Sequence, residues 1–265
     1  PDVLEKMATP MIGHRGKDAS ALQESVSKKL QKLFYTESEI LLSTSSGSGL
    51  MEGAIRSCTS RKAAVFSCGA FGDRWYKMAV TNNVKADLYN VDMGKAITPE
   101  MVETALATGQ YDLIAVQHNE TSTGITNPIE EIAEVVNKYK DVIFCVDAVS
   151  SAGGAKIEVD KLGIDILITS TQKALGLPPG MAICTFSERA IKRAETVEFR
   201  GTYFDLLAMY KYLKKKNYQY PSTPSLSHMF AMDYQLDNIL KEGLDKRFKR
   251  HEEMANLVRA WAQKH

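Results

Sequence analysis

The distribution of apolar residues along the chain predicts a regular series of strands. Seven short runs are rich in β-branched and other apolar residues, and most are continuous rather than alternating, which is typical of strands covered on both faces. They are EILLST (39–44), AAVFS (63–67), ADLYNV (86–91), DLIAVQ (112–117), VIFCVD (142–147), DILITS (165–170) and MAICTF (181–186).

Helical patterns lie between these runs. One begins near Ala19 with apolar residues three or four apart, another begins near Pro128, and TPEMVETAL (98–106) opens with a threonine cap and a proline. From about Ser225 the pattern is wholly helical. The alternation predicts an α/β fold: a mostly parallel seven-stranded sheet with helices on both faces, followed by an all-helical C-terminal stretch.

Composition narrows the classes of function. The chain has 265 residues, a formal net charge of +1 and one tight basic cluster (214–216), so no nucleic-acid or membrane partner is expected. No apolar run approaches the roughly 20 residues that span a bilayer. The four cysteines show no CxxC or Cys/His metal spacing, which predicts no metal site and favours a reducing, cytoplasmic setting.

Ligands of open α/β sheets bind beyond the carboxyl ends of the strands, and the first strand leads there into STSSGSGLMEG. Small residues and glycines open a helix at Leu50, so free backbone N–H groups with the Ser46 and Ser48 hydroxyls predict a phosphate cup. A plain flexible turn is the alternative. The stretch matches neither the Walker lysine pattern nor GxGxxG, which disfavours nucleoside triphosphates and NAD.

Four more strand ends carry candidate residues. Phe71 lies between two glycines and could stack on a planar ring, Thr121 belongs to a polar turn, and Asp147 closes an apolar run. Lys173 follows the sixth strand in STQKALGLPPG. Each has a structural alternative: a core aromatic, a tight turn, a helix cap and a solvated cation. Together they predict pyridoxal 5′-phosphate (PLP), a planar aldehyde with a phosphate and a basic ring nitrogen.

The ordered motifs SGSGLMEGAI, GAFGDRW, HNETSTGITNP, VDAVSSAGG, GIDILITSTQKALGLPPGMA and YPSTPS resemble the class V aminotransferases of fold-type I PLP enzymes. Within that family they are most similar to the serine–pyruvate and alanine–glyoxylate group. The resemblance implies that Lys173 is the Schiff-base lysine and that Asp147 contacts the pyridine nitrogen.

The resemblance also assigns the remaining cofactor contacts. It places Ser48, Gly49 and Leu50 in the phosphate cup with Gln172 nearby, Phe71 on the ring, and Thr121 at the ring hydroxyl. Tyr220 and Thr223 resemble residues that reach the phosphate of the neighbouring subunit, because the family forms homodimers.

The segment GHRGKD makes Arg15 a candidate substrate contact, with a surface cation as the alternative. The family continues into a C-terminal small domain that carries an arginine for the substrate carboxylate, and no position here matches it. We therefore expect a PLP-binding large domain over residues 1–240 and only the start of the small domain over 241–265.

The expected function is PLP-dependent transamination between alanine or serine and glyoxylate or pyruvate. Phosphoserine or aminoethylphosphonate transamination stays open because of His14 and Arg15. A cysteine desulfurase is disfavoured because the chain has STQK rather than SxHK. From another class, a fragment that holds PLP without activity stays open.

Overall fold

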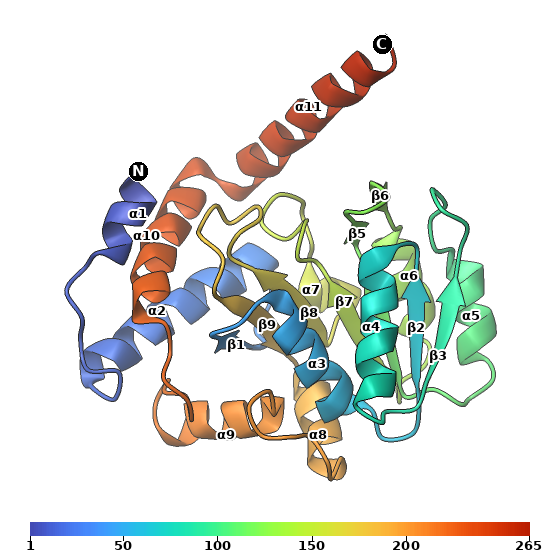
Figure 1. The fold of residues 1–265 in the computed structure, drawn as a ribbon, viewed down its shortest axis with the longest axis horizontal. Coiled ribbons are helices and arrows are strands. Elements are labelled where there is room, and N and C mark those ends of the chain that lie inside the picture. The colour runs from blue at the N-terminus through green and yellow to red at the C-terminus, as the bar shows by residue number, and fades with distance from the viewer.

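The computed structural model describes residues 1–265, and its centre is a seven-stranded sheet in the order β1-β9-β8-β7-β4-β2-β3 (Figure 1). Only β9 runs against the others, because it pairs antiparallel with both β1 and β8. The seven predicted strands are confirmed to within one residue at each end. They are β1 (Glu39–Ser43), β2 (Ala63–Ser67), β3 (Ala86–Asn90), β4 (Leu113–Gln117), β7 (Ile143–Asp147), β8 (Ile166–Ser170) and β9 (Ala182–Phe186).

Helices cover both faces of the sheet, as the sequence predicts: α3 and α4 lie in front of it in Figure 1, and α5, α6 and α7 lie behind. Thr98 caps α5 by accepting a hydrogen bond from the Met101 N–H at 3.4 Å. The helices are α1 (Asp2–Met7), α2 (Lys17–Phe34), α3 (Gly47–Cys58), α4 (Ala70–Thr81), α5 (Pro99–Leu106), α6 (Ile129–Val136), α7 (Val159–Leu162), α8 (Glu188–Thr196), α9 (Leu206–Lys215), α10 (Leu226–Glu242) and α11 (Leu244–Ala262).

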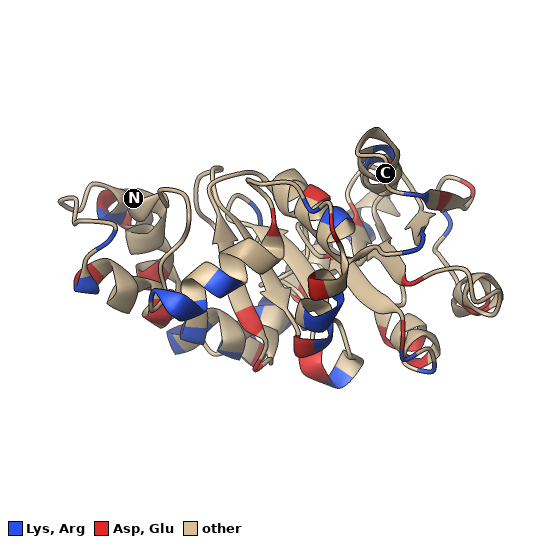
Figure 2. Ribbon diagram, turned by 90° about the horizontal axis from the view of Figure 1, so that it is seen from below, with Lys and Arg blue, Asp and Glu red and all other residues tan.

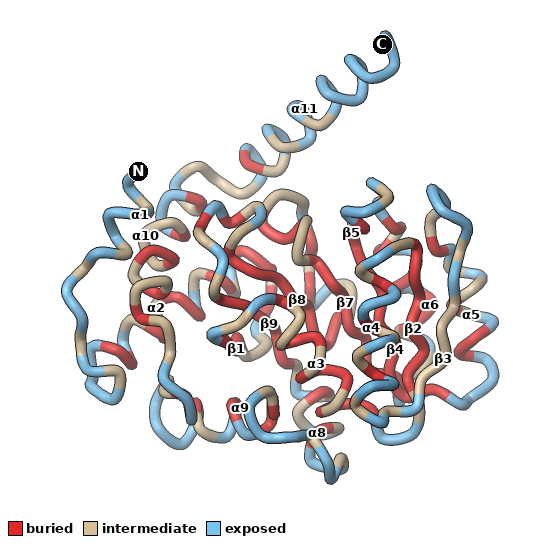
Figure 3. The backbone as a smooth tube through the Cα atoms, viewed as in Figure 1, coloured by how far each residue is buried: buried red, intermediate tan, exposed pale blue.

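The core lies along the central strands. Every residue of β2, β4, β7, β8 and β9 is buried (Figure 3), which explains why their sequences are continuously apolar. The edge strand β3 is only partly buried. A second, two-stranded sheet of β5 (Asn119–Glu120) and β6 (Ile125–Thr126) follows β4 and was not predicted.

Of the two C-terminal helices, only the last leaves the body of the molecule. Helix α10 packs against α1 and α2, whereas α11 projects outward from its first turn (Figures 1 and 3). Gly243 separates them, close to the expected boundary at residue 240, and the division into two domains stays a prediction. In the view of Figure 2, basic and acidic residues are interspersed along the helices. None of the helices is long and apolar enough to cross a membrane.

Candidate active site

The predicted catalytic residues lie at one edge of the sheet. Asp147 is the last residue of β7, and Lys173 follows the end of β8 at Ser170. Because β7 and β8 are parallel neighbours, their carboxyl ends meet at the same edge. Lys173 is exposed, in a turn closed by the Thr171 hydroxyl, which donates to the Pro178 carbonyl at 2.7 Å. The structure therefore places the exposed Lys173 side chain and the buried Asp147 carboxyl group at the same edge of the sheet.

Asp147 is buried and held by two hydrogen bonds. Its Oδ1 accepts from the Val149 N–H at 3.0 Å, and its Oδ2 accepts from the indole Nε1–H of Trp75 at 3.3 Å. Burial raises the pKa of Asp147 to about 6, because desolvation disfavours the charged form more than these donors stabilise it. A cationic partner would reverse that balance, and a protonated ring nitrogen is such a partner. Trp75 was not predicted as a site residue, because an aromatic residue on a helix usually belongs to the hydrophobic core.

The predicted phosphate cup lies at the start of α3, which begins at Gly47, three residues before the predicted Leu50. No side chain caps this helix, so the Gly47 and Ser48 N–H groups lack a capping oxygen, whereas the Gly49 N–H donates to the Ser46 carbonyl at 3.0 Å. The Ser48 hydroxyl accepts from the Arg74 guanidinium at 3.2 Å. Arg74, which the sequence analysis did not select, adds positive charge beside the cup and lies 4.9 Å from the ring of Phe71. Gly49 is required because a Cβ there would overlap the ring of Phe204.

Glu120, which was not among the predicted site residues, links the segments that carry Phe71 and Thr121. Its fully buried carboxylate accepts from the Phe71 and Gly72 N–H groups at 3.1 and 3.2 Å, at the first turn of α4. It also accepts from the Ser122 N–H at 3.1 Å and the Ser122 hydroxyl at 2.6 Å. A negative charge at a helix N-terminus is favourable. Glu120 therefore fixes the β5–β6 turn, with its exposed Thr121, against the helix that carries Phe71.

Several buried polar atoms at this edge have no hydrogen-bond partner within the protein. They include the Ser170 hydroxyl, the Gln172 Oε1 and both amide atoms of Gln117, which pairs in register with Asp147. The Ser170 hydroxyl lies 3.8 Å from where a Cβ on Gly47 would stand, at the start of α3. Buried polar groups are rarely left unpaired, so a polar ligand at this edge would complete them. A cofactor with a phosphate and a ring nitrogen fits this donor and acceptor set.

Tyr220 does not lie where its motif suggests. Its hydroxyl is buried and accepts from the Leu42 N–H at 2.8 Å and from the Gln23 Nε2 at 3.1 Å. Burial raises the pKa of this phenol. A hydroxyl engaged inside its own chain is not directed at a neighbouring subunit, so this placement argues against the expected phosphate contact. Thr223 is exposed and free to make such a contact.

Arg15 forms hydrogen bonds with the segment that carries Tyr220. Its guanidinium donates to the Tyr212 hydroxyl at 2.9 Å, to the Pro221 carbonyl at 3.2 Å and to the Tyr220 carbonyl. It also lies over the Tyr212 ring, 5.2 Å from the centroid. These bonds give Arg15 a structural role within its own chain, and its contact with the substrate stays a prediction.

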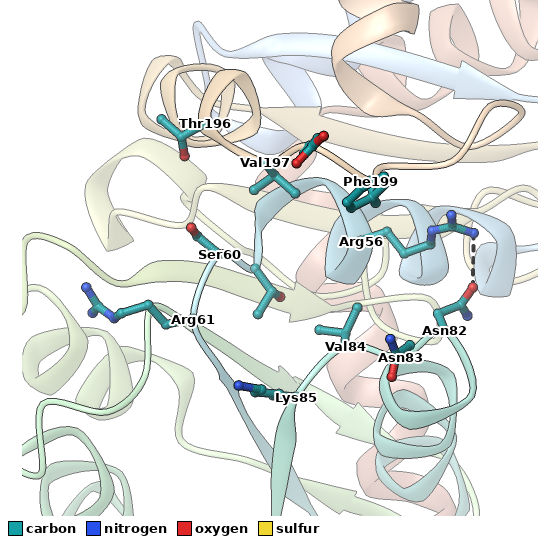
Figure 4. Close-up of a pocket in the computed structure, with 12 residues that line it drawn as sticks. Arg56, Ser60, Arg61, Asn82, Asn83, Val84, Lys85, Thr196, Val197 and Phe199 are labelled. Carbon is teal, nitrogen blue, oxygen red and sulfur yellow. Dashed lines mark hydrogen bonds between the residues drawn. The ribbon is translucent and has the colours of Figure 1, made fainter.

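Another opening in the protein is unrelated to this edge. A cavity of about 430 Å³ lies at the amino ends of β2 and β3, the opposite edge of the sheet from Lys173 (Figure 4). Its basic residues Arg56, Arg61 and Lys85 point in different directions, and Arg61 is paired with Asp141. None of the predicted site residues lines it.

Comparison with known proteins identifies the family. A family model described as aminotransferase class-V matches residues 4–261. An uncharacterised aminotransferase of Methanocaldococcus jannaschii is 43% identical over 98% of this chain and 68% of its own length. The alanine–glyoxylate aminotransferase of Oryctolagus cuniculus is 31% identical, over 96% of this chain and 67% of its own length. The crystal structure of an alanine–glyoxylate aminotransferase from Nostoc sp. matches with a TM-score of 0.89 at 28% identity, over 97% of this chain and 69% of that one. The chain therefore belongs to the class-V aminotransferase family of PLP-dependent enzymes, as its motifs predict.

Proposed function

We propose that this chain transfers an amino group from alanine or serine to glyoxylate or pyruvate, with PLP as its cofactor. The observation that supports the proposal is the position of exposed Lys173 and buried Asp147 at the carboxyl ends of neighbouring parallel strands. The two relatives described above that act on alanine and glyoxylate support the choice of substrates.

When bound, PLP supplies an aldehyde carbon that accepts an amine and a ring that takes up electrons. Lys173 is a primary amine on a flexible stem, so it can hold the cofactor covalently and be displaced by the substrate amine. Once displaced, the Lys173 Nζ would be free to take up the proton of the substrate Cα and to return it, as a general base and acid. Asp147, held by Trp75 and the Val149 N–H, would stabilise the protonated form of the ring nitrogen.

The other contacts orient the cofactor. The backbone of Gly49 and Leu50 with the Ser48 hydroxyl would bind the phosphate at the α3 N-terminus, with Gln172 beside it. Phe71 would cover the ring, held in place by Glu120. Thr121 would bind the ring hydroxyl from the β5–β6 turn.

We also propose that the chain acts as a homodimer in which Thr223 of one protomer reaches the phosphate site of its partner. Thr223 is exposed, in a segment bounded by Pro221 and Pro224 and braced by Arg15. The four cysteines are free and buried, which suits a reducing compartment, and we propose the cytoplasm.

A half-reaction screen tests the function. The chain loaded with PLP is mixed in turn with alanine, serine, phosphoserine and aspartate, and the cofactor absorbance is followed in a single turnover. We expect alanine or serine to react fastest, and a Lys173→Ala variant to react with none. Preference for phosphoserine would overturn the substrate assignment, and Arg15, already engaged with its own chain, would not explain it. Bound PLP that no amino acid alters would favour a binding role without activity.

A further inference from the structure

A single buried arginine connects the two turns that carry Asp147 and Lys173. Arg247 lies in the first turn of α11 and is only 7% exposed. Its Nε donates to the Gly153 carbonyl at 2.6 Å, in the turn that follows Asp147. One terminal nitrogen donates to the Ala174 carbonyl at 2.5 Å, directly after Lys173, and the other donates to Glu242 at 3.0 Å.

The two turns also pack directly against each other. A Cβ on Gly153 would lie 3.0 Å from Leu175 Cδ2, and one on Gly154 would lie 3.2 Å from Ala174 Cβ. Gly153 has a φ of +85°, a conformation that favours glycine. The turns therefore meet at a distance that leaves no room for a side chain, and Arg247 spans the junction.

The rest of the Lys173 loop is held from α10. Gln235 Nε2 donates to the Leu175 carbonyl at 2.9 Å, and the His228 ring nitrogen Nε2 lies 3.1 Å from the Pro179 carbonyl. Each of these side chains contacts one turn only. Among these side chains only Arg247 bonds to both turns, so it reinforces the direct contact between them at a fixed spacing.

We propose that Arg247 is a positioning residue that fixes the spacing between the Asp147 turn and the Lys173 turn. The inference rests on the proposed function, in which both residues act on one cofactor. The planar guanidinium suits the role because its donors diverge in fixed directions, which allows one side chain to hold two carbonyls and a carboxylate together. A lysine keeps the charge but offers a single nitrogen, which cannot reproduce the fork.

The test compares Arg247→Met and Arg247→Lys with Arg250→Met. Arg250 is a matched control, because its Nε donates to the same Glu242 at 2.6 Å, yet its side chain is 47% exposed and bonds to neither turn. The first readout is amide hydrogen exchange of the cofactor-free chain over residues 148–156 and 171–180. We expect faster exchange in both segments for the Arg247 variants and no change for Arg250→Met.

The second readout is the kinetics of the PLP-loaded chain. A shift of about 1 Å between Asp147 and Lys173 should lower kcat about 10–100-fold in Arg247→Met and Arg247→Lys, with little change in KM. Unchanged exchange in both segments would overturn the proposal, as would faster exchange with an unchanged kcat. If the parent chain turned over no amino acid, the proposed function would fall, while the exchange result would still decide whether Arg247 holds the turns together. Arg247→Lys keeps the experiment decisive if Arg247→Met does not fold.

Discussion

Replacement of Asp147 by asparagine should stabilise the cofactor-free protein at alkaline pH. Burial raises the pKa of Asp147 from 3.8 to about 6, so the folded chain keeps a proton that the unfolded chain has already released. Folding stability therefore falls as the pH rises from about 4 through 6 and is level above that. Asparagine does not titrate, so the difference in stability between variant and parent should grow by about 2–3 kcal/mol between pH 4 and pH 8.

A loss of folding stability that does not depend on pH offsets part of this gain in stability. The asparagine amide N–H would face the Trp75 N–H, and the lost hydrogen bond costs about 1 kcal/mol at every pH. For a domain of this size, each kcal/mol shifts Tm by roughly 2–4 °C, so the Tm difference should change by about 5–10 °C over the pH range.

Thermal unfolding of both cofactor-free proteins between pH 4 and pH 8 measures the effect. Asp92→Asn serves as the control, because Asp92 is exposed in a loop. Parallel Tm profiles for the parent and Asp147→Asn would refute the reasoning, since they would mean that Asp147 does not carry a buried charge. With PLP bound, the same variant should retain the cofactor but slow Cα proton transfer by orders of magnitude, since a neutral amide cannot stabilise a protonated ring.

Four further substitutions separate chemistry from structure. Lys173→Ala should abolish borohydride trapping of PLP. Because Lys173 is exposed, the variant should change the free energy of unfolding by less than about 0.5 kcal/mol. A trapped adduct found on another residue by mass spectrometry would contradict the assignment of Lys173. Tyr220→Phe should destabilise the chain by about 1–3 kcal/mol in urea unfolding, since two buried donors lose their acceptor. Thr223→Ala should leave stability unchanged but weaken both PLP binding and dimerisation in sedimentation runs, and equal affinity in monomer and dimer would rule out a shared site. Glu120→Gln should lower Tm, because an amide replaces a carboxylate that accepts four hydrogen bonds, whereas exposed Glu134→Gln should not.

The strands were predictable because their signal is local. Each of the central strands is buried on both faces, so the requirement for apolar residues acts on every position and leaves a continuous run. The β5–β6 pair was missed for the opposite reason. A two-residue strand has no periodicity, and its position depends on Glu120 reaching α4.

The site residues likewise divide into those with a local signal in the sequence and those without one. Asp147 is the last residue of an apolar run and Lys173 comes shortly after the end of another, so their place at the sheet edge follows from the strands themselves. Trp75 and Arg247 act through contacts with segments distant in sequence, and nothing in their own neighbourhoods distinguishes them from a core aromatic and a solvated basic residue. The direction of the Tyr220 side chain, whose hydroxyl contacts Leu42 and Gln23 of its own chain, could not be predicted, because a loop motif does not specify which way a side chain points.

The antiparallel strand β9 has a consequence for how the chain folds. It pairs with β8 through residues close in sequence, such as Ser170 with Ala182, so this hairpin with its Lys173 loop can form early. Its other neighbour, β1, is synthesised long before it. Ser43 of β1 cannot pair with Ala182 until β9 has been made. Since β1 has no other partner in the sheet, a strand that lies early in the sequence is among the last to be paired. Until then it is an exposed apolar strand, the kind of segment that aggregates or recruits chaperones during synthesis.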